Sequence, residues 1–196
     1  MINETIKVAK ELFNRGLVTG STGNISFRKD DIVYISKTNT SFRTLAENDF
    51  ATINLRTGDI SGKPSKEFPL HLALYKNNDD IEAIIHTHSF YSTLISCLKN
   101  QTKAISNLFS YTPYLKMKTK EKIISVSYNA PGSTDLFSDF EKSVDKEVST
   151  YILRNHGIVV GSKSIVDCFN IIEEFEQSAK ISCYIQHYNK EEYSEI

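Results

Sequence analysis

Helical and strand patterns alternate along the chain, and several neighbouring strands are separated by only a short turn. Short turns join antiparallel strands, whereas parallel strands need a longer crossover connection. We expect strands at residues 24–28, 32–36, 51–55, 81–88 and 123–128, and two more around a turn within 151–160. We expect helices at residues 4–14, 65–76, 91–98, 134–144 and 164–186. The sequence therefore predicts an α/β fold in which helices cover both faces of a mixed, largely antiparallel sheet.

The length and composition fit one globular domain over residues 1–196. Hydrophobic residues make up 40% of the chain and charged residues 24%, an ordinary balance for a soluble domain. The formal net charge is −1, from 23 Lys and Arg against 24 Asp and Glu, whereas nucleic-acid and membrane partners usually require a basic excess. No stretch approaches the ~20 apolar residues of a membrane span. We therefore expect neither nucleic acid nor membrane as a partner.

The three cysteines, Cys97, Cys168 and Cys183, are odd in number, widely spaced and set among apolar neighbours. Such a pattern does not suggest a disulfide framework. We expect small buried thiols and a reducing compartment, the cytoplasm.

Three histidines form the chemically most informative pattern. His86 and His88 lie two residues apart in an apolar strand, so their side chains should point to the same face. His156 lies far downstream, in a turn before a glycine. Neutral imidazoles are common zinc ligands, and three protein ligands leave a fourth position open in a catalytic site. The pattern favours a divalent metal site over the alternative, in which the histidines merely fill a polar patch.

Glu67 is expected in the first turn of the helix at 65–76, where the helix dipole favours a carboxylate. It could serve only that local role, or it could be a fourth metal ligand or a base beside the metal. His71 shares its helical face four residues later and is assigned to packing or to an indirect supporting role. His187 lies in a charged tail, where we expect it to be solvated.

Three turns rich in small residues and hydrogen-bond donors suggest a phosphate pocket. The segment 20–26 offers backbone N–H groups in a glycine turn, and the segment 37–41 adds hydroxyl and amide groups. Segment 64–66 supplies a helix N-terminus with Lys66 beside it. Ser65 could equally be only the N-cap of that helix.

The motifs at 23–26, 64–67, 86–88 and 155–157, in this order, resemble the class II aldolase/adducin family over about residues 4–186. That family includes fuculose-phosphate aldolase and ribulose-phosphate 4-epimerase. The resemblance implies a three-layer α/β/α fold, a bound zinc or similar divalent ion, and a homotetramer with active sites at the subunit interfaces.

The resemblance also implies roles for individual residues. His86, His88 and His156 would ligate the metal, and Glu67 would be the acid or base and a possible ligand. Tyr114 would reach into the site of a neighbouring subunit, although Tyr111 competes for that role. The phosphate pocket would be lined by Asn24, Thr38, Asn39, Ser65 and Lys66.

Two departures from the sugar-phosphate aldolase pattern point to one branch of the family. Asn39 stands where those aldolases usually have glycine, and Lys66 where they usually have serine. With the segments 70–75, 112–114 and 130–133, these residues resemble the 3-oxo-tetronate 4-phosphate decarboxylases. The implied substrate is a small phosphorylated sugar acid, which would be converted to dihydroxyacetone phosphate and carbon dioxide through a metal-stabilised enediolate.

Three other functions remain open at this point. A zinc aldolase of the fuculose-phosphate type, or a 4-epimerase, would use the same metal but need not accommodate a carboxylate. An adducin-like binding module would be expected to lack some metal ligands, whereas this chain has all of them. A metal-dependent hydrolase would need a water-activating arrangement, for which Glu67 is the only candidate.

Overall fold

A computed structural model describes residues 1–185 and 194. Its centre is an eight-stranded sheet with the strand order β4-β3-β2-β1-β5-β8-β7-β6. Every neighbouring pair is antiparallel except β6 and β7, which are parallel. The strands are β1 (Asn24–Lys29), β2 (Ile32–Ser36), β3 (Phe50–Asn54), β4 (Ile60–Ser61), β5 (Ala83–Thr87), β6 (Ile123–Val126), β7 (Thr150–Leu153) and β8 (Gly157–Ser162). The predicted mixed, largely antiparallel sheet is confirmed.

Short turns account for part of the antiparallel pairing. β1 and β2 are joined through Asp30, which adopts a left-handed conformation with φ 54°, and β7 and β8 are joined through Asn155, also with φ 54°. Asp and Asn tolerate this conformation better than most residues. The parallel pair β6 and β7 is instead connected across α6 (Thr134–Ser143), as a parallel connection requires.

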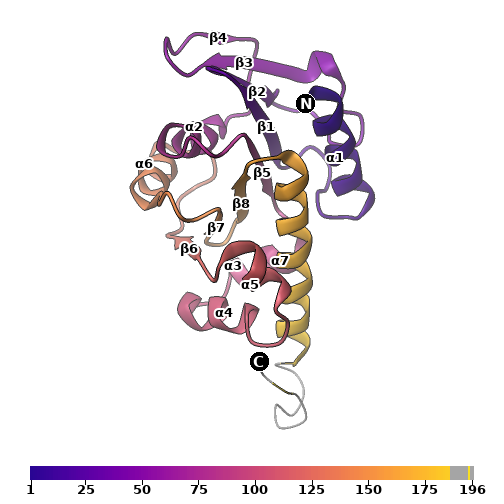
Figure 1. Ribbon diagram of the computed structural model, residues 1–196, viewed down its shortest axis with the longest axis vertical. Coiled ribbons are helices and arrows are strands. Elements are labelled where there is room, and N and C mark those ends of the chain that lie inside the picture. Colours follow the sequence, from indigo (N-terminus) through magenta and orange to yellow (C-terminus); the bar gives the residue numbers. More distant parts are fainter. Residues whose placement is uncertain (186–193, 195–196) are drawn as a thin grey trace.

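Two helical layers cover the sheet (Figure 1). One core packs the first face against α1 (Ile2–Asn14), α3 (Phe90–Ser96), α4 (Gln101–Leu108), α5 (Tyr114–Thr119) and the 21-residue α7 (Ile165–Ile185). A second core packs the other face against α2 (Phe68–Asn77) and α6. The arrangement is the expected three-layer α/β/α fold. Among the described residues, no helix is long and apolar enough to cross a membrane.

The start of α2 differs from the prediction. The helix begins at Phe68 with Glu67 at the N-cap position, so Ser65 is not the N-cap. The preceding segment is instead held against the end of β2, where Lys37 and Pro64 form an isolated bridge and the Ser65 N–H donates to the Ser36 carbonyl oxygen at 3.0 Å. This pairing keeps the backbone out of the helix until Glu67, which therefore lies at the helix entrance.

Four elements were not predicted, and several boundaries moved by one to three residues. The short helices α4 and α5, the 3-10 helix Glu47–Asp49 and the two-residue strand β4 lie in segments left without an assignment. α4 has eight residues, of which Ala104 and Leu108 are buried, and so short a segment offers too few turns for its apolar spacing to identify a helix. β5 ends at Thr87, one residue before His88.

The cysteines are all free, but they do not share one environment. Cys168 is buried and Cys183 is partly buried, whereas Cys97 is exposed. The expectation of three buried thiols is therefore wrong for Cys97, which follows α3 at its exposed C-terminal end. The single domain over residues 1–196 and the cytoplasmic location stay predictions.

Candidate metal centre

His86 lies in the middle of the sheet. Its strand β5 pairs with β1 on one side and β8 on the other, and His86 is in register with Asn24 and Val159. The side chain is fully buried, and its Nδ1 donates to the Ile158 carbonyl oxygen at 2.8 Å. Because a carbonyl oxygen only accepts, this bond fixes the proton on Nδ1 and directs Nε2 into the site, as is usual for metal-binding histidines.

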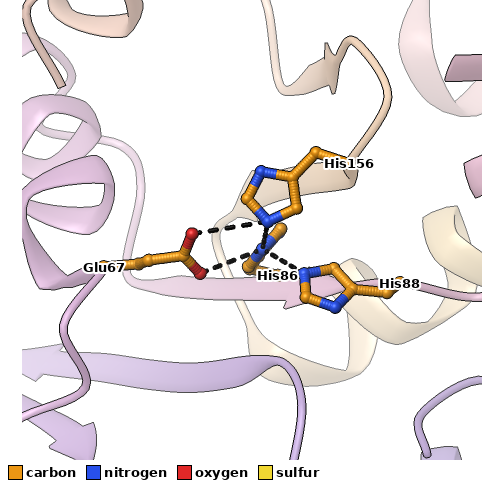
Figure 2. Close-up of side chains that lie close together, drawn as sticks. All are labelled: Glu67, His86, His88 and His156. Atoms are coloured by element: carbon orange, nitrogen blue, oxygen red, sulfur yellow. Dashed lines mark hydrogen bonds and ion pairs between the residues drawn. The ribbon is translucent and has the colours of Figure 1, made fainter. Parts of the chain in front are cut away.

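The three predicted histidine ligands and Glu67 converge on one point (Figure 2). His86 Nε2 lies 2.8 Å from His88 Nε2 and 3.3 Å from His156 Nε2. The Glu67 carboxylate closes the fourth side, with Oε2 at 3.2 Å from His86 Nε2 and Oε1 at 3.4 Å from His156 Nε2. One ligand atom from each residue lies within 4.8 Å of all the others.

Two glycines allow this convergence. Gly23 has φ 76°, and a Cβ there would lie 2.7 Å from the His86 carbonyl oxygen. Gly157 packs against the Thr87 backbone, and a Cβ there would come within 2.9 Å of His88 Cδ2. No larger residue fits at either position without moving β5, so the glycines of both sequence motifs place the histidine strand.

The charges within the site favour cation binding. Burial raises the pKa of Glu67, but the facing His86 and the other two histidines outweigh it and hold that pKa well below its usual range. Burial lowers the pKa of His86, and the Glu67 carboxylate more than compensates, so that this pKa is raised. Burial, followed by the charge of His86, lowers the pKa of His88 to about 3 and that of His156 to about 4. An ionised carboxylate and two neutral imidazoles are therefore present at neutral pH.

These residues fit a divalent metal by their donor chemistry. Three imidazole nitrogens and one carboxylate are a usual zinc ligand set. Glu67 Oε1 is buried and accepts no hydrogen bond, a state that is unfavourable for a carboxylate oxygen without a compensating cation. His86, His88, His156 and Glu67 could therefore hold the ion, which would compete with a proton for Nε2 of His86.

His88 is followed directly by α3, whose N-terminus is held by one carboxylate. Glu176 of α7 accepts hydrogen bonds from the Tyr91 N–H at 2.8 Å and the Ser92 N–H at 2.9 Å. The Ser89 hydroxyl also donates to Glu176 at 2.8 Å. A carboxylate satisfies the free N–H groups of a helix start and is favoured by the helix dipole, so Glu176 fixes the chain immediately after the histidine ligand.

A cavity of about 460 Å³ opens beside the metal ligands. The three donor-rich segments expected to form a phosphate pocket all contribute to its wall, together with Glu67, His88 and His156. The predicted binding residues Asn24, Thr38, Asn39, Ser65 and Lys66 are all among its lining residues. The fold thus brings together five residues that lie in three separate parts of the sequence.

Tyr114 does not line this cavity; it lies at the start of α5 with 59% of its surface exposed. Tyr111 is not part of the cavity wall either. The structure describes a single chain, so the role of either tyrosine in a neighbouring site stays a prediction. His187 lies outside the described residues.

Three residues of the cavity wall were not assigned to the pocket from the sequence: Pro131, Gly132 and Asn155. Lys37 also lines the cavity and belongs to the predicted segment 37–41. Asn155 directly precedes the predicted ligand His156, so its closeness in sequence could have identified it. Pro131 and Gly132 reach the cavity from the loop before α6, and no local pattern of metal or phosphate binding marks that loop.

Asn24 and His71 lie behind Glu67. The Asn24 side-chain NH₂ donates to Glu67 Oε2 at 3.2 Å, and Asn24 Oδ1 lies 2.5 Å from His71 Nε2. Asn24 therefore uses its amide within the protein while it also faces the cavity. Burial, followed by the charge of His86, lowers the pKa of His71 to about 3, so its ring is neutral.

Comparison with known proteins agrees with the family that the four motifs resemble. The sequence matches the Class II Aldolase and Adducin N-terminal domain over residues 3–183. It is 36% identical to an L-fuculose phosphate aldolase of Methanocaldococcus jannaschii, over 90% of this chain and 92% of that protein. It is 34% identical to a 3-oxo-tetronate 4-phosphate decarboxylase of Pectobacterium atrosepticum, over 91% of this chain and 81% of that protein.

The fold also resembles a solved structure. The fold superimposes on the crystal structure of YgbL from Escherichia coli with a TM-score of 0.86 and 29% sequence identity, covering 99% of this chain and 92% of that one. The likeness extends over nearly the whole chain, so it includes the sheet and the backbone segments that carry the three histidines.

Proposed function

The chain belongs to the class II aldolase and adducin family, and we propose that it is a zinc-dependent lyase that decarboxylates a 3-oxo-tetronate 4-phosphate to dihydroxyacetone phosphate and carbon dioxide. Members of this family with similar sequences carry the names of both a decarboxylase and an aldolase. The choice between the two reactions rests on the cavity.

The observation that carries the proposal is the position of Asn39 and Lys66. Both line the cavity beside Glu67, and they are the two positions at which this sequence departs from the aldolase pattern. Lys66 adds a positive charge for a substrate that carries both a phosphate and a carboxylate. Asn39 has φ 63°, a conformation that glycine would also adopt, so it adds an amide without requiring a different backbone.

The metal would be held by His86, His88, His156 and Glu67, and when bound it would supply Lewis-acid stabilisation of the negative charge that develops on the substrate oxygens. The hydroxyl groups of Thr38 and Ser65 and the ammonium group of Lys66 would bind the phosphate and carboxylate. Backbone N–H groups of the glycine turn at 20–23 would contribute to the same anion pocket.

In the proposed reaction the bond between the carboxylate carbon and C2 breaks, and carbon dioxide leaves. The electron pair of that bond stays on the remaining three-carbon phosphate, and C2 then takes up one proton. Glu67 is the acid or base that borders the cavity, and Tyr114 of a neighbouring subunit is the second candidate for moving this proton. We also propose the homotetramer with interfacial sites, in which the exposed Tyr114, absent from the cavity wall of its own chain, would reach the site of a neighbouring subunit.

A fuculose-phosphate type aldolase is the second candidate function. It is supported by the 36% identity to the relative named as an L-fuculose phosphate aldolase, and its chemistry would use the same ligands and acid or base. An adducin-like binding module is less well supported, because all four ligand groups are present and brought together.

One experiment separates these functions. The zinc-loaded protein is incubated separately with 3-oxo-tetronate 4-phosphate and with fuculose 1-phosphate, and dihydroxyacetone phosphate is measured with a coupled dehydrogenase. Product from the first substrate alone is the expected result, whereas product from the second alone would make the chain an aldolase. No product from either substrate, together with no bound metal, would support the binding module.

A further inference from the structure

Five buried polar side chains form a continuous line from the inside of α2 to the metal centre. Glu67, His71 and Tyr75 follow one another at four-residue spacing in and before α2, and Asn24 and Ser26 alternate on β1. Spacings of four in a helix and two in a strand each place side chains on one face. All five residues are at most 9% exposed, so their polar groups depend on one another for hydrogen bonds.

The direction of each bond can be worked out from the carboxylate outward. A carboxylate only accepts hydrogen bonds, so the Asn24 atom at 3.2 Å from Glu67 Oε2 must be its NH₂ group. The Asn24 oxygen then faces His71 Nε2 at 2.5 Å, and this nitrogen must carry the proton. A neutral ring protonated on Nε2 has its acceptor at Nδ1.

The remaining bonds continue in the same direction. The Ser26 hydroxyl lies 2.7 Å from His71 Nδ1 and must donate to it. The Ser26 oxygen then accepts from the Tyr75 hydroxyl at 2.8 Å. Every donor in the line therefore points toward Glu67, and such aligned bonds strengthen one another in a buried environment.

We infer that His71 is a positioning residue for Glu67: its Nε2–H fixes the orientation of the Asn24 amide, whose NH₂ group holds the Glu67 carboxylate against the three histidines. Without that N–H, the buried Asn24 oxygen loses its donor, and the amide is no longer held in the orientation that presents its NH₂ group to Glu67. The inference rests on the proposed role of Glu67 at the metal. It also connects Asn24, which the family resemblance places in the phosphate pocket, to the acid or base itself.

The first test requires neither metal nor substrate. In the metal-free protein, side-chain ¹⁵N chemical shifts distinguish a histidine protonated on Nε2 from one protonated on Nδ1. We expect His71 to carry its proton on Nε2. A proton on Nδ1 would overturn the inference, because Nε2 would then accept from Asn24 and place the Asn24 oxygen next to Glu67.

The second test asks whether His71 acts through Glu67, with Co²⁺ as the probe. Binding of Co²⁺ is measured by visible absorption for the wild type, His71→Leu, Glu67→Gln and the double variant. We expect His71→Leu to weaken Co²⁺ binding by about 10- to 100-fold, as is typical when the partner of a metal ligand is lost. In the Glu67→Gln background the same change should have little further effect. An equal loss in both backgrounds would show that His71 does not act through Glu67.

Two further variants exclude a general loss of structure. His71→Gln retains an N–H donor near the position of Nε2, so its Co²⁺ affinity should lie closer to the wild type than that of His71→Leu. Leu74→Ala removes a buried apolar side chain from the same helix and should lower stability while Co²⁺ affinity is retained. If Leu74→Ala weakened Co²⁺ binding as much as His71→Leu, the positioning role would be disproved.

The outcomes also separate this inference from the proposed function. If the protein bound Co²⁺ but turned over neither sugar phosphate, the proposed function would be wrong. The Co²⁺ measurements would still decide the role of His71. If the wild type bound no Co²⁺, the proposed metal would be disproved, and the position of the His71 proton would decide the inference.

Discussion

Gly157 packs so closely against Thr87 that a methyl group at position 157 would overlap the Thr87 carbonyl oxygen. This contact joins the turn that carries His156 to the strand that carries His86, immediately before His88. The relative position of all three histidines therefore depends on the absence of a side chain at one residue.

Gly157→Ala should displace β5 from β8 and weaken metal binding. Overpacking of this kind destabilises a protein by about 1–3 kcal/mol, and we expect at least a tenfold weaker Co²⁺ affinity, or about 1.4 kcal/mol. Isothermal titration and urea unfolding measure the two effects. Gly161→Ala is the matched control in the same strand, because the nearest atoms to its new methyl group are side-chain atoms of Ile81. A Gly157→Ala protein with unchanged Co²⁺ affinity would contradict this prediction.

The metal-free protein should lose stability as the pH falls below about 6.5. The pKa values of His71, His88 and His156 are lowered from 6.5 to about 3, 3 and 4 in the folded state. Between these values the unfolded chain binds more protons than the folded one, so the free energy of unfolding decreases on acidification. The lowered pKa of Glu67 acts in the same direction below its usual value of 4.5.

His86 acts in the opposite sense, because its raised pKa contributes stability at low pH that is lost as the pH rises. Each of the three histidines with a lowered pKa should reduce the free energy of unfolding by on the order of 1 kcal/mol between pH 6.5 and 5. Because only His86 acts in the opposite direction, we expect a net decrease. Urea unfolding at pH 7.5 and 5.5 measures this decrease. His71→Gln has one titrating group fewer and should depend less on pH. A free energy of unfolding that rose between pH 7.5 and 5.5 would refute the assignment of neutral histidines.

Lys66→Ala should impair substrate use far more than folding. Lys66 lines the cavity but is exposed, and substitutions at exposed positions usually change stability by no more than about 0.5 kcal/mol. Loss of a charge-assisted contact of about 1.5–3 kcal/mol should raise KM by roughly 10-fold or more. Steady-state kinetics with the 3-oxo acid phosphate measure this, and Lys63→Ala, an exposed lysine outside the cavity wall, is the control. Unchanged kinetics for Lys66→Ala would remove the main support for a doubly anionic substrate.

Glu176→Gln should destabilise the protein and disturb His88. An amide can accept some of the four hydrogen bonds made to this carboxylate, but its NH₂ group would face the N–H donors of α3. We expect a loss of about 1–3 kcal/mol in the free energy of unfolding and weaker Co²⁺ binding. Glu173→Gln on the same helix removes only a partly exposed ion pair with Arg15 and should cost less than about 1 kcal/mol. Equal losses for the two variants would argue against a special role of Glu176.

Tyr114→Phe should lower kcat without changing stability, if the tyrosine moves a proton in a neighbouring subunit. Its side chain is 59% exposed in the single chain, so loss of the hydroxyl removes no buried contact. A mixture of Tyr114→Phe and Glu67→Gln subunits, refolded together, should regain part of the activity, because some sites would combine the intact Glu67 of one chain with the intact Tyr114 of another. Refolded mixtures of Tyr111→Phe and Glu67→Gln serve as the comparison. Activity that never exceeded the sum of the separate variants would place Tyr114 outside the site.

The order of strands and helices was largely accessible from the sequence, because the apolar spacing and the turn residues act locally. The start of α2 was not, because Lys37 and Pro64 pair across 27 positions and delay the helix. The helices α4 and α5 were missed for a related reason. They have eight and six residues, which is too short for apolar spacing alone to identify a helix, and they pack against α7 in the folded chain.

The groups that could bind a metal and an anion are identifiable in the sequence, because residue types and their spacing on one strand or helix are local properties. Three relationships appear only in the folded chain: His156 reaches His86 and His88, three donor-rich turns line one cavity, and Asn24 lies between Glu67 and His71. These relationships depend on the pairing of β1, β5 and β8. Contacts between distant segments arise from the free energy of the whole packed chain, which no single stretch of sequence contains.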